Sequence, residues 1–215
     1  MTTTASTRTP IVKSIRRAGA WCLSGGLLGA VEVLVVLAWS PQVSDERFSH
    51  PFSSPWYFVA EVSFALQHML LVLGGLALLS LPAVRASATA RIATQAAVAG
   101  LVLLVIMELS TLSLYEAAKD STLATVIATL FLLPVMLIGV GLTAAGVALL
   151  RRGTAGWTGA RWLPAAVLAP GVYVFVALAP TVNAPDPVGR LGIGAWMLLF
   201  AVLGYGLTRI DGRHA

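Results

Sequence analysis

The sequence predicts an all-α fold, a single polytopic membrane bundle of six transmembrane helices with both termini in the cytoplasm. Of the 215 residues, 58% are hydrophobic and only 11% are charged, whereas about a quarter of the residues in a soluble domain are charged. The apolar residues are gathered into six long stretches, and Lys and Arg fall mainly on one side of them. The first two observations predict membrane helices, and the third predicts their orientation.

Each of the six stretches has about 18 residues or more, the length that a helix needs to cross a bilayer. The joining segments are short, so each span is expected to satisfy its own backbone hydrogen bonds within one bundle. We expect a cytoplasmic tail at 1–17, a single six-helix domain at 18–208 and a second cytoplasmic tail at 209–215. The predicted spans are 18–39, 56–81, 92–115, 122–150, 162–181 and 191–208.

Individual spans carry further signals. The first span follows a basic segment and, at about 22 residues, is too long for a typical signal peptide, so we interpret it as a retained anchor. The second and third spans contain acidic residues, which are treated below. The first, fourth and sixth spans are rich in glycine, which predicts close helix packing. Pro134 and Pro170 lie in the middle of the fourth and fifth spans, where each removes a backbone hydrogen bond and predicts a kink.

The distribution of basic residues sets the predicted orientation. With the N-terminus inside, the inner segments contain eleven Lys and Arg residues, and the outer segments contain three, Arg47, Lys119 and Arg190. This bias predicts a multi-pass protein of the cell inner (plasma) membrane. The net charge of +5 is scattered singly or in pairs over the inner segments, so we interpret it as a topology signal with membrane lipid as the partner, and expect no nucleic acid.

Three glutamates lie inside apolar spans at nearly the same predicted depth. Glu32 and Glu108 are each about seven residues, roughly 10 Å, from the outer ends of their spans, and Glu61 is roughly 7 Å from its own. His68 lies near the midplane, on the helix face of Glu61. Because a carboxyl group in hydrocarbon costs several kcal/mol unless it is protonated, paired or hydrated, we predict that these four residues form a ligand-binding or proton-binding site.

Other polar residues are predicted to support this cluster. Gln67 is next to His68 in the sequence. Thr111 and Tyr115 follow Glu108 by three and seven residues, which gives the third span a polar stripe. Thr129 belongs to a similar stripe at the outer end of the fourth span. The predicted site is therefore an acidic pocket in the outer half of the bundle.

The sequence leaves three functions open. Close carboxylates cannot easily all ionise, so at least one is expected to be protonated, as in an outward-opening pocket that binds or transports a proton, small cation or cationic amphiphile. Alternatively, the same residues join helices in a structural or accessory subunit, with a second copy or another membrane subunit as partner. A third hypothesis is a lipid-modifying enzyme that uses a Glu as general acid.

We expect no metal and no cofactor. Cys22 is the only cysteine, which excludes CxxC redox chemistry. His68 is a single histidine, which is weak evidence for a metal site. His50 and His214 are predicted on opposite sides of the membrane, which excludes bis-His haem ligation within the bilayer. No P-loop, HExxH or Gly-rich dinucleotide motif occurs. An enzyme is therefore not the favoured interpretation.

The stretch from Gly139 to Pro180 includes GLTAAGVALLRRGTAGWTGARWLP, followed by a span that contains a proline. This stretch resembles the uncharacterised six-span integral membrane proteins that are common in high-GC actinobacteria. The ratio of twelve Arg to two Lys fits a high-GC genome. The resemblance implies a six-span fold and a membrane location, and it transfers no functional residues.

Overall fold

The computed structural model describes residues 8–153, 160–181, 184 and 187–210. In this part of the chain every secondary-structure element is a helix, apart from one isolated bridge between Arg47 and Ala118, so the predicted all-α class is confirmed. Six helices are long and apolar enough to cross a membrane. They are Ile11–Ala38, Trp56–Ser80, Ala88–Leu114, Thr122–Arg151, Leu163–Thr181 and Val188–Thr208.

Some of these six runs consist of more than one helical segment. The second is followed by a single short turn, the third ends in a 3₁₀ turn, the fourth is divided in two, and the fifth contains a π-helical turn. The segments are α1 (Arg8–Ala38), α2 (Trp56–Ser80), α3 (Pro82–Arg85), α4 (Ala88–Thr111), η1 (Leu112–Leu114), α5 (Thr122–Leu130), α6 (Leu132–Arg151), α7 (Leu163–Tyr173), η2 (Val174–Leu178), α8 (Ala179–Thr181) and α9 (Val188–Thr208).

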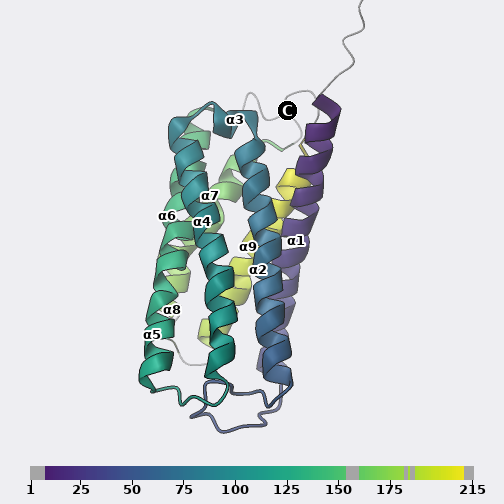
Figure 1. The fold of residues 1–215 in the computed structure, drawn as a ribbon. Helices are drawn as coiled ribbons and strands as arrows, with labels where there is room; N and C mark the ends of the chain where they lie inside the picture. Colours follow the sequence, from purple (N-terminus) through teal and green to yellow (C-terminus); the bar gives the residue numbers. More distant parts are fainter. Residues whose placement is uncertain (1–7, 154–159, 182–183, 185–186, 211–215) are drawn as a thin grey trace, which may run out of the picture.

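The six runs form a closed ring in chain order (Figure 1). α1 packs on α2, α2 on α4, α4 on α6, α6 on α7, and α7 on α9, which returns to α1. Two loops, 39–55 and 115–121, lie together at the end opposite the start of α1, which we call the distal end. They are joined there by backbone hydrogen bonds, from Phe48 to Ala117 at 2.9 Å and from Lys119 to Glu46 at 2.8 Å.

The first helix starts ten residues before the apolar stretch that predicted it. α1 begins at Arg8, whereas the expected span began at residue 18. The added turns bury Val12 and Ile15, which are 7% and 2% exposed, while Lys13 faces solvent. Apolar residues three apart lie on one helix face, so this basic segment still presents an apolar stripe that packs on the bundle.

Both mid-span prolines coincide with an irregularity in their helix, as predicted. α5 ends at Leu130, the residue whose carbonyl would otherwise accept the N–H that Pro134 lacks. Pro170 stays within α7, and the π-helical turn begins four residues after it, at Val174. The carbonyl of Pro170 accepts a hydrogen bond of 2.9 Å from the indole of Trp196 on α9, which ties the irregular helix to its neighbour.

Glycines allow α1 and α9 to approach at the level of the backbone. A Cβ atom added to Gly26 of α1 would lie 2.4 Å from the backbone nitrogen of Ala201, and one added to Gly204 of α9 would lie 2.3 Å from that of Leu23. A side-chain carbon this close to a backbone nitrogen would overlap with it, so only glycine fits at these positions. The close packing predicted from the glycines is therefore confirmed for this helix pair.

Candidate functional site

The predicted acidic residues lie on three neighbouring helices. Glu32 comes from α1, Glu61 and His68 from α2, and Glu108 from α4. α2 packs against both of the others (Figure 1), so it brings the other two helices together around its own polar face. Glu108 lies within electrostatic range of both Glu61 and Glu32, and we call these residues together the acidic cluster.

Glu61 is held by a threonine from α4. Its side chain is only 9% exposed, and the hydroxyl of Thr111 lies within hydrogen-bond distance of both Glu61 Oε2 and the backbone carbonyl of Glu108. A hydroxyl carries a single proton, so Thr111 can donate to only one of these two oxygen atoms at a time. Both become hydrogen bonds when the Glu61 carboxyl is protonated and donates to Thr111, which then donates to the carbonyl.

His68 is oriented by its own helix and by two side chains. Its Nδ1 lies 2.8 Å from the carbonyl oxygen of Phe64, and since a carbonyl can only accept, Nδ1 carries a proton. The amide nitrogen of Gln67 lies 3.1 Å from Nδ1 and 3.2 Å from Nε2, and Nε2 is the ring atom that is then left to accept in the neutral imidazole. A carboxyl oxygen of Glu108 lies 3.6 Å from Nδ1. The acidic neighbour of His68 is thus Glu108, and its side-chain hydrogen-bond partner is the adjacent Gln67.

Glu32 belongs to α1 and contacts α2 from the side away from α4. One of its carboxyl oxygens accepts a hydrogen bond from the hydroxyl of Ser63, while the other is buried and has no hydrogen-bond partner among the described residues. The same is true of the side-chain oxygen of Gln67, a residue that is 3% exposed. Glu32 therefore leaves one buried acceptor unused.

The predicted supporting residues divide into two groups. Gln67 and Thr111 contact the cluster directly, as described above. Tyr115 lies beyond it, where its hydroxyl accepts a hydrogen bond from the backbone of Ser54 at 3.0 Å. Thr129 is exposed, and its hydroxyl donates to Thr125 of its own helix at 2.8 Å. The described contacts of Thr129 thus lie within α5, and its support of the cluster stays a prediction.

The sequence interpretation missed two residues of the site, Tyr57 and Ser63. Tyr57 is 2% exposed, and its hydroxyl donates to the backbone carbonyl of Thr111 at 2.6 Å. It precedes Glu61 by four residues, as Ser63 precedes Gln67. Residues four apart share a helix face, so this spacing was a signal that could have identified both.

Aromatic side chains pack over the distal side of the cluster. The ring of Tyr57 lies 5.6 Å from those of Phe58 and Tyr115, and Tyr57 packs with buried Val36 and Phe52. A pocket that opens outward was expected here. In this conformation the aromatic residues and the joined distal loops lie between the carboxyl groups and the distal surface.

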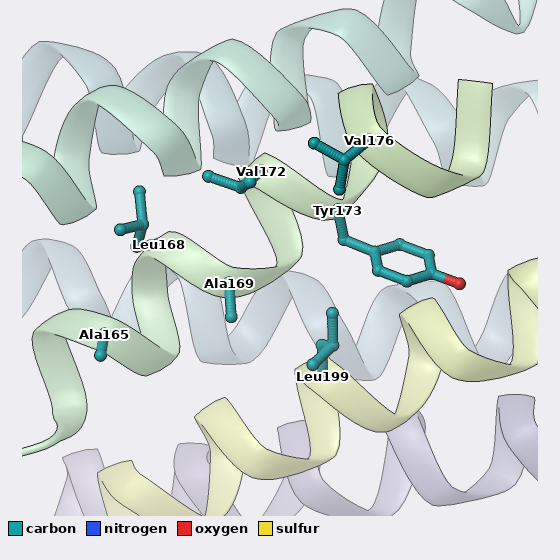
Figure 2. A pocket seen from close by; sticks show the side chains of 7 residues that line it. All are labelled: Ala165, Leu168, Ala169, Val172, Tyr173, Val176 and Leu199. Atoms are coloured by element: carbon teal, nitrogen blue, oxygen red, sulfur yellow. The ribbon is translucent and has the colours of Figure 1, made fainter. Parts of the chain in front are cut away.

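A groove of about 400 Å³ belongs to other helices (Figure 2). It runs along α7 and η2 beside α9, and the side chain of Tyr173 lies across one end. Its lining is apolar apart from that hydroxyl, which bonds the carbonyl of Gly192 at 3.1 Å. The residues that line it are Ala165, Leu168, Ala169, Val172, Tyr173, Val176 and Leu199.

The acidic cluster does not have the set of three imidazole, thiolate or carboxylate ligands that many metal centres use. Within 8–153, 160–181, 184 and 187–210, no three His, Cys, Asp or Glu side chains are placed so that they could hold a metal ion. The cluster instead contains separate hydrogen bonds of hydroxyl, amide and imidazole groups, which join Ser63 to Glu32, Thr111 to Glu61 and Gln67 to His68. Such an arrangement can hold and exchange protons.

Comparison with protein-family models, with curated proteins and with solved structures finds no match to this chain. Its function is therefore argued from its own residues.

Proposed function

We propose that this chain is an integral protein of the cell inner (plasma) membrane, with six spans, both termini in the cytoplasm, and an intramembrane site that binds protons. In this proposal the site serves the binding or transport of a small cation or cationic amphiphile. The eleven-to-three distribution of Lys and Arg supports the orientation, and it places the distal end outside.

The observation that carries the proton-binding proposal is the proton count at Thr111. Its one hydroxyl faces two acceptors, the Glu61 carboxyl and the Glu108 carbonyl. A proton on Glu61 satisfies all of these groups at once, and its loss would leave a buried negative charge without a full set of donors. The neighbouring pair of His68 and Glu108 at 3.6 Å offers a second place for that proton. The cluster thus contains a proton and a nearby acceptor for it.

A second candidate function is structural. The hydrogen bond from Ser63 to Glu32 joins α2 to α1, and the contact of Thr111 with Glu61 joins α4 to α2. Hydrogen bonds across membrane helices contribute about 0.6 kcal/mol on average, which is enough to favour one helix arrangement. On this view the carboxyls hold three spans together and exchange no protons.

Infrared titration of the purified protein in lipid nanodiscs separates these two functions. The carbonyl band of a protonated carboxyl group disappears when that group ionises, so the proton-binding proposal expects such a band to decrease as the pH is raised. Glu61→Gln removes that titrating band. Glu116→Gln, which changes an exposed distal residue, is the matched control and retains it. If E61Q leaves every titrating band in place and lowers only the melting temperature, the structural function is the correct one.

The orientation has its own test in single-cysteine labelling. Cys22 is fully buried, so the native chain gives a low background. Asp45→Cys in the distal loop and Ala86→Cys between α3 and α4 are both exposed positions. A membrane-impermeant maleimide added to intact cells should label D45C and leave A86C unlabelled. The reverse pattern would invert the orientation.

A further inference from the structure

Two oxygen atoms in the buried interface of α1 and α2 accept no hydrogen bond. They are Oε2 of Glu32 and Oε1 of Gln67, and neither has a partner among the described residues. A buried acceptor without a donor carries the full cost of its lost hydration. Two such atoms on the same helix pair, one of them on a carboxyl group, require either donors or a positive charge.

The orientation of the Gln67 amide follows from His68. The amide nitrogen of Gln67 lies 3.1 Å from Nδ1 and 3.2 Å from Nε2 of His68, and because Phe64 takes the Nδ1 proton, Nε2 is the ring atom that can accept from it. The amide oxygen therefore points away from the imidazole. It rests against α1, where a Cβ atom added to Gly29 would lie 2.3 Å from it. Glycine at this position leaves the amide oxygen its space.

The contacts of Glu32 and Gln67 bring their side chains toward the same level between α1 and α2. Glu32 follows Gly29 by three residues on α1, and Ser63, which donates to Glu32, precedes Gln67 by four residues on α2. The two helices are antiparallel (Figure 1), and helical side chains lean toward the N-terminus of their own helix. Glu32 therefore leans toward the level of Gln67, and Gln67 leans toward the level of Glu32. Met197 of α9 lies beside Gly29 and borders the same space.

The groups that converge here are a carboxylate oxygen, an amide oxygen and a hydroxyl oxygen, which are the ligand types that hard cations prefer. A water molecule could donate to both orphan acceptors, and a proton on Glu32 could be donated to Gln67, but neither would compensate an ionised Glu32. A monovalent cation satisfies both oxygens and neutralises the single carboxylate. We propose that Glu32, Ser63 and Gln67 bind an alkali cation of the size of Na⁺ between α1 and α2.

This inference rests on the proposed function in one respect, that the acidic cluster is a cation-accepting site, and it adds the identity of one ligand. It also divides the cluster by role. Glu61, Thr111, His68 and Glu108 handle the proton on the α4 side of α2, while Glu32, Ser63 and Gln67 take the alkali cation on the α1 side. α2 supplies groups to both sites, so occupancy of one can influence the other.

Sodium-dependent thermal unfolding in lipid nanodiscs tests the proposal. Ionic strength is held constant with N-methylglucamine chloride while Na⁺ is raised, and radiolabelled Na⁺ binding is measured on the same samples. A ligand that binds only the folded state stabilises it by RT ln(1 + L/Kd), where L is the free ligand concentration. The wild-type protein should therefore melt several degrees higher in saturating Na⁺ and should bind the label.

Glu32→Gln and Gln67→Leu should both abolish the sodium response and the binding of the label. Matched controls are Glu116→Gln for the charge and Gln95→Leu for the amide, since both residues are exposed, and both variants should respond as the wild type does. If E32Q or Q67L fails to fold, the milder Ser63→Ala, which removes one hydroxyl, should weaken Na⁺ binding severalfold.

The proposal is overturned if the wild-type protein shows no sodium response, or if E32Q and Q67L retain it in full. That failure is separable from a failure of the proposed function. The titrating infrared band of Glu61 would persist if the cluster binds protons but no alkali cation. A normal sodium response without that band would mean that the cluster binds the alkali cation and that Glu61 binds no titratable proton.

Discussion

α1 packs against its two neighbours by different means. Toward α9 it presents Gly19 and Gly26, and the backbones of the two helices meet almost directly. Toward α2, in its distal half, it presents Glu32 to Ser63 and Gly29 to the amide of Gln67. The first interface leaves no room for adjustment, since backbone atoms cannot move aside. The second contains side chains with unused hydrogen-bonding capacity, which is where a ligand can be accommodated.

The contrast extends to the two halves of the ring. The described polar contacts of the acidic cluster come from α1, α2 and α4, whereas α7 and α9 border an apolar groove. The α9 side is therefore suited to hold the bundle together, and the α2 side to carry the chemistry. Three substitutions test this division, from the largest expected effect to the smallest.

Gly26→Leu should have the largest effect on folding. The new side chain would begin 2.4 Å from the backbone nitrogen of Ala201, and overpacking a tight interface costs about 1–3 kcal/mol and occasionally more. Because the neighbour is backbone, we expect the upper end of this range, measured as a large drop in melting temperature or loss of monodisperse protein. Ala20→Leu adds a similar bulk on an exposed face of the same helix and should be tolerated. Equal behaviour of the two variants would mean that α1 and α9 are not in backbone contact.

Thr111→Val should have an intermediate effect. The change keeps the shape of the side chain but removes the hydroxyl that contacts Glu61 and the carbonyl of Glu108. A buried polar group left without its partner costs about 1–3 kcal/mol. The melting temperature should fall, and the infrared band of Glu61 should shift, while Thr111→Ser should restore both. An unchanged band in T111V would show that Thr111 does not hold the carboxyl.

The sequence was sufficient to predict the helical class and six helices long and apolar enough to cross a membrane, because apolar length is a local property. It also placed Glu32, Glu61 and Glu108 at one level, since the rise per residue of a helix is fixed. It could not predict the pairs. Whether His68 contacts Glu61 or Glu108 depends on how α2 is rotated against α4, and an error of a fraction of a turn changes the partner.

The start of α1 and the contacts of Thr129 within α5 were missed for related reasons. The turns before residue 18 are basic along most of their surface, so an apolar window does not detect their buried stripe of Val12 and Ile15. The fourth span reads as one continuous apolar stretch, but its helix is divided at Phe131. The sequence pattern of a single apolar helix does not contain this break.

Thr129→Val should have the smallest effect, and it is the matched control for Thr111→Val because the chemical change is identical. Thr129 is exposed, and its hydroxyl bonds only to Thr125 of the same helix among the described residues. Substitutions at exposed sites away from special features usually stay within about 0.5 kcal/mol of the wild type. T129V should therefore leave the melting temperature, the sodium response and the infrared band unchanged. A shift in the band would place Thr129 in the proton-binding network after all, and the chemistry would then extend beyond α1, α2 and α4 to the fourth span.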